Sequence, residues 1–111
     1  MTSRRRSRFA STVARAVAEI LEFEVKDPVL RAALPTVLGV RLSPDGEEAV
    51  VAVAVGGEAV DREAARAALA HDGAFVRARL ARRLAVRRVP KLSFVLASAL
   101  GSPPLPQKRD G

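Results

Sequence analysis

One unbroken apolar run in the middle of the chain constrains the fold more than any other feature. Residues 49–55 read "AVVAVAV", without a polar side chain among them. Such a run is typical of a strand at the centre of a sheet. The residues before it, "SPDGEE" at 43–48, supply a proline and an Asp-Gly pair for a chain reversal, and residues 36–42 read as another strand. The sequence therefore predicts a hairpin whose second strand is central.

A helix is predicted ahead of this hairpin, from Arg8 to the Asp27-Pro28 pair. Its apolar residues recur at helical spacing: Phe9, Val13, Ala16, Val17, Ile20 and Leu21. Proline pushes the residue before it out of the helical conformation, so Asp27-Pro28 ends the helix. The segment that follows, around Pro35, is expected to be an ordered loop.

A second helical region and a third strand complete the predicted elements. Asp61 can cap the segment "REAARAALAHDGAFVRARLARRL" at residues 62–84. Aspartate and glycine are poor interior helix formers, so we expect this helix to break or kink at Asp72, Gly73 and Ala74. Residues 91–97 alternate as a strand. The predicted fold class is α+β, with a three-stranded sheet covered by helices on one face.

The 111 residues are expected to form one domain. Residues 1–7 are predicted to be a flexible basic arm, residues 8–98 the folded domain, and residues 99–111 a disordered proline-rich tail. The chain has no cysteine, which excludes disulfides, thiolate metal sites and a cysteine nucleophile. No apolar run approaches the ~18 residues of a membrane span, and we expect a cytoplasmic location.

Positive charge is confined to the two ends of the chain. Residues 1–16 carry five basic residues and no acid, residues 17–72 have a net charge of −6, and residues 73–111 have a net charge of +8. A basic protein made only for solubility would spread its charges. This segregation indicates a protein that binds a polyanion, with nucleic acid as the first choice.

The strongest basic cluster has no acid within its own segment. It contains Arg77, Arg79, Arg82, Arg83, Arg87, Arg88 and Lys91. Cations near a helix C-terminus also compensate the helix dipole, which is the structural alternative. A patch of one sign is better explained by phosphates, so these residues are the predicted RNA contacts, and the predicted basic arm adds Arg4, Arg5, Arg6 and Arg8.

Gly73 permits two interpretations at this stage. The helix ends there and restarts, or the break exposes backbone N–H groups that attract a phosphate. Base stacking is not expected, because the chain has neither Trp nor Tyr and its four Phe residues, at 9, 23, 75 and 94, occupy core-like positions. What remains is contact through phosphates and helix ends, as in a KH module.

Catalysis is not predicted. The single histidine, His71, precedes Asp72, and neighbours on a helix do not face each other. The sequence has neither a nucleophile-elbow motif nor a phosphate-binding glycine loop. We therefore expect no enzyme activity, no cofactor and no metal.

Three segments in order resemble the bacterial ribosome-binding factor A (RbfA) family, which has a type II KH-like fold. They are "ARAVAEILEFEVKDPVL", "VLGVRLSPDGEEAVVAVAV" and "FVRARLARRLAVRRVPKLSFV", which together span most of residues 8–96. The last ends in the family's Arg-x-Val-Pro-x-Leu-x-Phe pattern. The resemblance implies the order helix–strand–strand–helix–kink–helix–strand. The family's Ala-x-Gly kink signature is altered here to Asp72-Gly73-Ala74.

The resemblance implies a non-enzymatic ribosome assembly factor. Such a protein binds the immature small (30S) ribosomal subunit through 16S rRNA and assists late rRNA processing and maturation. It implies a cytoplasmic monomer without a membrane or small-molecule partner. Two alternatives stay open: a general KH-like module for RNA or DNA, and a protein-interaction domain in which the "AVVAVAV" strand pairs in a dimer.

Overall fold

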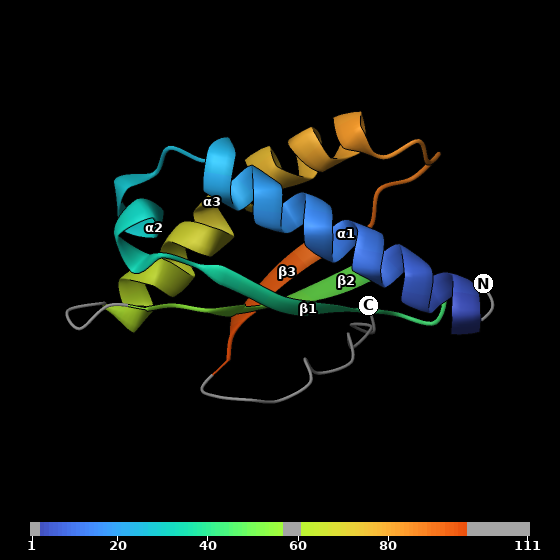
Figure 1. Cartoon of the computed structure of the whole chain (residues 1–111), viewed down its shortest axis with the longest axis horizontal. Coiled ribbons are helices and arrows are strands. Elements are labelled where there is room, and N and C mark those ends of the chain that lie inside the picture. Colours follow the sequence, from blue (N-terminus) through green and yellow to red (C-terminus); the bar gives the residue numbers. More distant parts are fainter. Residues whose placement is uncertain (1–2, 57–60, 98–111) are drawn as a thin grey trace, which may run out of the picture.

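Three helices lie on one face of a three-stranded sheet in the computed structural model (Figure 1), which describes residues 3–56 and 61–97. Along the chain the elements are α1 (Ser3–Phe23), α2 (Pro28–Ala33), β1 (Thr36–Leu42), β2 (Glu48–Ala54), α3 (Arg62–Arg83) and β3 (Lys91–Leu96). The predicted α+β class, the hairpin and the third strand are confirmed. The predicted tail at 99–111 lies outside the described residues.

The apolar run forms β2, the central strand, as the sequence predicts. The order in the sheet is β1-β2-β3, with β1 antiparallel and β3 parallel to β2. Val51 pairs with Val40 on one side and with Phe94 on the other. Val51 and Val53 are fully buried, because a central strand has a neighbour at each edge and helices across its inner face.

The core fills the space between the sheet and the two long helices. Val13, Val17 and Ile20 of α1 are fully buried, and Leu69 and Leu80 of α3 are buried beside them. Their spacing puts them on one stripe of each helix. Burial of such aliphatic side chains contributes about 1.5–3 kcal/mol each, which fixes both helices on the sheet and sets the position of every polar group described below.

A tight turn joins β1 to β2. The Ser43 hydroxyl donates to Asp45 Oδ1 at 2.6 Å and accepts the Glu48 N–H at 3.0 Å. Gly46 has φ of 74°, a value that a side chain disfavours. The backbone N–H of Lys91 donates to Glu47 O at 2.9 Å. The turn is therefore held against the start of β3.

The structure corrects two expectations for the first third of the chain. Helix α1 begins at Ser3, so residues 3–7 of the predicted flexible arm are helical. Residues 29–33 of the predicted ordered loop instead belong to helix α2, whose N-cap Asp27 accepts the Val29 N–H at 2.9 Å. Pro28 suits the first helical turn because that position needs no N–H donor.

The predicted break in α3 does not form, whereas a kink within the continuous helix stays a prediction. The helix runs through Asp72, Gly73 and Ala74 without interruption, so neither a C-cap nor a second helix N-terminus forms at Gly73. Glycine costs a helix roughly 1 kcal/mol, and packing of the α3 stripe on both sides of it outweighs that cost. A Cβ at Gly73 would lie 3.7 Å from Phe94 Cε2, so β3 passes directly beneath this point.

Candidate nucleic-acid interface

The connector, residues 84–90, is folded back along α3 by one arginine. Arg77 donates from Nη2 to Val89 O at 2.9 Å and from Nε to Pro90 O at 3.3 Å. Leu84 caps the helix through its N–H to Leu80 O. Arg77 was predicted to contact RNA. The structure uses it to shape the connector, and both carbonyls are satisfied by one guanidinium.

Two other arginines of α3 form ion pairs with acids of the α1 segment. Arg83 donates to Glu19 Oε1 at 2.8 Å and to Glu24 Oε2 at 2.6 Å, and Arg79 lies 3.5 Å from Glu24. The bond with Glu24 raises the pKa of Arg83. We call this group, Glu19, Glu24, Arg79 and Arg83, the clasp. Its acids come from the opposite end of the sequence, so Arg79 and Arg83, which look unpaired in the sequence, are paired in three dimensions.

Other predicted contacts keep their charges exposed. Within the described part of the chain, the side chains of Arg82, Arg87 and Lys91 make no hydrogen bond or ion pair. Arg88 lies 3.8 Å from Glu47, but the two side chains are 85% and 61% exposed. A pair so open to water contributes little and exchanges readily for another anion.

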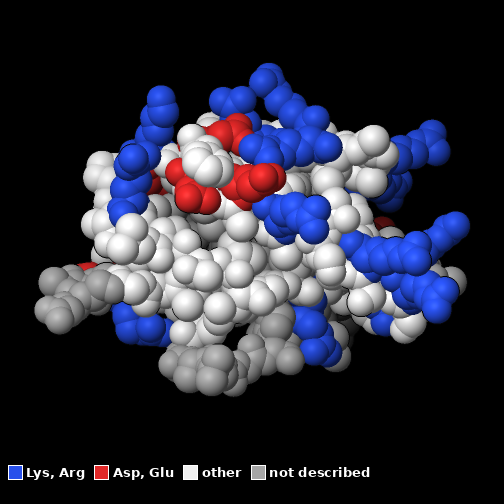
Figure 2. Space-filling model, in the orientation of Figure 1, with Lys and Arg blue, Asp and Glu red and all other residues white. Residues whose placement is uncertain are grey.

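The start of α1 brings more cations to the same end of the molecule. Phe9 and Arg87 line one groove, and the preceding turns of α1 carry four arginines. We define the basic end as Arg4, Arg5, Arg6, Arg8, Arg87, Arg88 and Lys91. Figure 2 shows several blue side chains at the end where α1 begins and others beside the acidic cluster, which lies nearer the other end of α1. The structure thus joins the two basic segments of the sequence.

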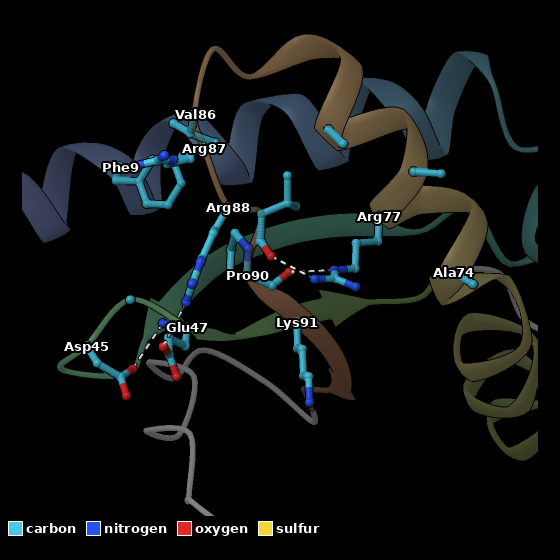
Figure 3. Close-up of a pocket in the computed structure, with 14 residues that line it drawn as sticks. Phe9, Asp45, Glu47, Ala74, Arg77, Val86, Arg87, Arg88, Pro90 and Lys91 are labelled. Carbon is cyan, nitrogen blue, oxygen red and sulfur yellow. Dashed lines mark hydrogen bonds and ion pairs between the residues drawn. The ribbon is translucent and has the colours of Figure 1, made fainter.

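An open groove of about 1110 Å³ lies at this end. Its lining includes Ala74, Ala78 and Ala81 of α3, which recur at i, i+4 and i+7 and therefore share one helix face. The connector and the Asp45–Glu47 turn also line it, and Figure 3 shows Pro90 of the connector between α3 and that turn. Sequence patterning did not identify this groove, because its lining comes from four separate segments.

Comparison with known proteins agrees with this architecture. The family model described as ribosome-binding factor A matches residues 5–101. The chain belongs to the ribosome-binding factor A family. The curated ribosome-binding factor A of Moorella thermoacetica is 38% identical over 92 residues, which are 83% of this chain and 75% of that protein.

Solved structures of ribosome-binding factor A from Thermus thermophilus have the same fold. The crystal structure of that protein matches with a TM-score of 0.71 and 36% identity, over 82% of this chain and 93% of that one. A homology model of the Thermus thermophilus protein, fitted into a cryo-EM map of a 30S–RbfA complex, matches with a TM-score of 0.67 and 33% identity, over 81% and 92%. The predicted family resemblance and KH-like class are confirmed.

The chain has an acidic pair at the altered kink signature. Burial of the Asp72 carboxyl and its hydrogen bond with Asp27 raise the pKa of Asp72 to about 6. The same hydrogen bond lowers the pKa of Asp27. Two ionised carboxylates cannot donate to each other, so the contact requires a proton. Asp72 lies beside Asp27, the N-cap of α2, and its Oδ2 is buried without another hydrogen-bond partner.

Two of the four phenylalanines are less buried than predicted. Phe23 is 69% exposed and Phe75 is 40% exposed, whereas Phe9 and Phe94 pack against the core. Arg79 lies over the Phe75 ring, 5.1 Å from its centroid, which is a cation–π distance. The expectation of four core phenylalanines is wrong for these two.

The acidic side chains and the helices bear on two other kinds of site. Within residues 3–56 and 61–97, His, Asp and Glu side chains form no group of three that could hold a metal ion. Over the same residues, none of the helices combines the length and apolar character needed to cross a membrane.

Proposed function

We propose that this chain is a ribosome assembly factor that binds the immature small (30S) subunit through 16S rRNA and assists late rRNA processing and maturation. In this proposal it acts in the cytoplasm as a monomer, without catalytic activity. Family membership supports the proposal. So does the Thermus thermophilus protein of the 30S–RbfA complex, with which this chain shares its fold.

The observation that carries the proposal is the basic end. Its side chains come from α1, the connector and β3, and Arg87, Arg88 and Lys91 line an open groove. The side chains of Arg87 and Lys91 have no partner within the described residues, so they are available to displace counterions from phosphates, which supplies affinity that depends on salt. We propose Arg87, Arg88 and Lys91 as the central RNA contacts, flanked by Arg82 and the four α1 arginines.

Arg77, Arg79 and Arg83 have a different place in this proposal. Each already bonds within the chain, and releasing it for a phosphate would leave a carbonyl or a carboxylate unpaired. They support the interface by holding the connector and α3 in position. The part of α3 at Asp72–Ala74 packs against α2 and β3. In this proposal it binds no phosphate.

Co-sedimentation tests the proposal directly. The purified chain is mixed with small subunits, large subunits or unrelated duplex RNA, at low and at high salt. We expect selective binding to small subunits that weakens at high salt. Equal binding to all three would support only a general RNA-binding module. Binding to none would contradict both, and would favour the protein-interaction alternative.

A matched pair of variants connects that result to the basic end. Arg87→Gln with Lys91→Gln removes two charges from the basic end, while Arg31→Gln with Arg62→Gln removes two exposed charges outside it. We expect the first pair to lose binding and the second to retain it. Equal loss in both variants would refute the assignment and would leave only a net-charge effect.

A further inference from the structure

The outer face of the sheet, which points away from the helices, is buried at its centre. Side chains alternate along a strand, so Val50 and Ala52 of β2 point away from the core that contains Val51 and Val53. Neither residue belongs to that core, yet Val50 is 7% exposed and Ala52 is 1% exposed. Figure 1 shows the three helices on the other side of the sheet. Another part of the chain therefore has to cover these two side chains.

The neighbours of Ala52 within the sheet do not supply that cover. Ala52 pairs with Gly39 on one side and with Val95 on the other. Gly39 has no side chain, and Val95 is itself only partly buried. Side chains of adjacent strands stand roughly perpendicular to the sheet, so they flank a central residue without covering its end. The cover lies above the face.

A polar group adds a requirement at one end of the same face. Alternation along β2 puts Glu48 on the side of Val50 and Ala52, next to the turn that precedes the strand. The Glu48 Oε2 atom is buried, and it has no hydrogen-bond partner within the described part of the chain. A buried carboxylate oxygen without a donor costs free energy. The occupant of the face should therefore be apolar over the centre and carry a donor, preferably a cation, at the turn end.

The C-terminal segment of the chain, residues 98–111, has this pattern. It reads "SALGSPPLPQKRDG", with leucines at 100 and 105 followed by Lys108 and Arg109. The segment follows β3, an edge strand of the sheet. Val50 and Ala52 are buried within a single chain, which favours a segment of that chain over a second copy as the cover.

The length and direction of this segment also fit. Strand β3 is parallel to β2, with Lys91 opposite Glu48 and Leu96 opposite Val53, so the segment leaves the sheet at the end away from Glu48. Residues 98–108 span about 36 Å when extended, whereas the seven residues of β2 span about 23 Å. The leucines can therefore lie over the centre of the face while the cations reach Glu48.

Proline favours a position across the face over a fourth strand at the edge. Pro103, Pro104 and Pro106 have no N–H, so they cannot donate the hydrogen bonds that an added strand next to β3 would require. Proline also restricts the free segment to extended conformations, which reduces the entropy lost on docking.

We propose that residues 98–109 dock on the outer face of the sheet, with their leucines over its apolar centre and their two cations beside Glu48. Composition alone predicts disorder for residues 99–111, because composition does not reveal a surface that the segment can cover. Docking brings Lys108 and Arg109 to the end of the sheet where Lys91 lies. Their contribution to the basic end rests on the proposed function, whereas the docking does not.

A single introduced thiol tests the docking, because the chain has no cysteine of its own. Ala52→Cys places the thiol on the outer face and Ala49→Cys places it on the inner face, and both positions are 1% exposed. Each variant is made in the full chain, once with the native segment and once with Leu100→Ser plus Leu105→Ser. The rate of reaction with a small aromatic disulfide measures the access of solvent to the thiol. Circular dichroism checks that each variant folds.

We expect the leucine substitutions to speed the reaction of Ala52→Cys by roughly tenfold or more, because they release the cover by local opening. Ala49→Cys should react slowly with either segment. Fast reaction of Ala52→Cys with the native segment, or the same slow rate with both segments, would overturn the proposal. Protection that increases with protein concentration would overturn it too, because a second copy would then be the cover.

A second measurement leaves the face unaltered, so it decides the matter even if Ala52→Cys fails to fold. A nitroxide attached at Gln107→Cys should broaden the amide NMR signal of Glu48 far more than that of Leu69 in α3, and the leucine substitutions should abolish this difference. Equal broadening of the two signals with the native leucines would contradict docking. Neither assay contains a ribosome, so a failure of the docking is distinguishable from a failure of the proposed function.

Discussion

Gly73 lies inside α3 in ordinary helical conformation, and its missing side chain leaves a site that a methyl group can fill. An added Cβ would meet Phe94 at 3.7 Å, an ordinary van der Waals contact. We predict that Gly73→Ala stabilises the chain by about 1 kcal/mol, because alanine is the better helix former and restricts the unfolded state. Urea unfolding measures the change.

Gly46 is the control for this prediction. Its φ of 74° disfavours a side chain, so Gly46→Ala should destabilise the chain by about 1 kcal/mol. A loss of stability in Gly73→Ala would contradict the packing described here, and it would restore the interpretation of Gly73 as a required kink.

The carboxyl pair gives a prediction about pH. The folded pKa of Asp72, about 6, lies above its ordinary value of 3.8, so the fold prefers the protonated acid. The stability that this proton supplies is present below about pH 4 and is lost as pH rises through 6. Asp72→Asn keeps a donor toward Asp27 at every pH. The variant should therefore gain stability relative to the native chain as pH rises.

We expect the gain at pH 8 to exceed that at pH 5 by about 1 kcal/mol, allowing for the part of Asp72 that faces solvent. Chemical unfolding of both chains at the two pH values measures it. A difference that does not depend on pH would show that Asp72 titrates normally and shares no proton with Asp27.

At the scale of elements, the clasp holds the C-terminal end of α3 against α1. Arg83 bonds both Glu19 and Glu24, and its own side chain is 35% exposed. A partly exposed network of this kind contributes about 1 kcal/mol. Arg83→Gln should lower the free energy of unfolding by that amount, whereas Arg82→Gln, which removes an unpartnered neighbour, should leave it unchanged.

A double-mutant cycle with Glu24→Gln separates the clasp from general charge effects. If Arg83 and Glu24 interact, the cost of the double variant is smaller than the sum of the two single costs. Strict additivity would mean that the pair contributes nothing to stability.

Periodicity explains which elements the sequence predicts correctly. The α1 stripe and the β1–β2 hairpin rest on local pattern and turn chemistry, and both form. Helix α2 was missed because six residues are too few to show a period, although Asp27-Pro28 is an N-cap signal followed by a proline at the first helical position. The α3 break was wrongly predicted because local propensity at Gly73 yields to packing on either side.

The sequence predicts which types of residue form the candidate site, but it does not predict which groups each of them contacts. Composition identifies the basic segments. The acids that neutralise Arg83 lie 64 and 59 residues away in sequence, which no local pattern reveals. The backbone carbonyls that bind Arg77 are equally invisible in sequence. Tertiary structure alone divides the arginines into those that hold the fold and those that face solvent.

At the scale of the whole molecule, basic and acidic side chains concentrate in different regions. The basic end gathers cations from α1, the connector and β3, while the acids of α1 lie toward its other end (Figure 2). Binding to RNA should therefore follow a steep salt dependence. Each cation that contacts a phosphate adds about 0.7–0.9 to the slope of log affinity against log salt.

Arg87→Gln should reduce that slope by about one contact, and Arg31→Gln should not change it. Titrations with single-stranded RNA at several salt concentrations measure both. An equal reduction in the two variants would indicate that affinity follows net charge, without a defined end of the molecule.

The most direct test compares two pairs of arginine and lysine substitutions for binding to small subunits. Arg87→Gln with Lys91→Gln removes exposed cations of the basic end, and Arg79→Gln with Arg83→Gln removes the cations of the clasp. We predict that the first variant stays as stable as the native chain and loses co-sedimentation at low salt. The second should unfold at lower urea and still co-sediment. The opposite result, with binding lost only in the clasp variant, would contradict the division of the arginines on which the account depends.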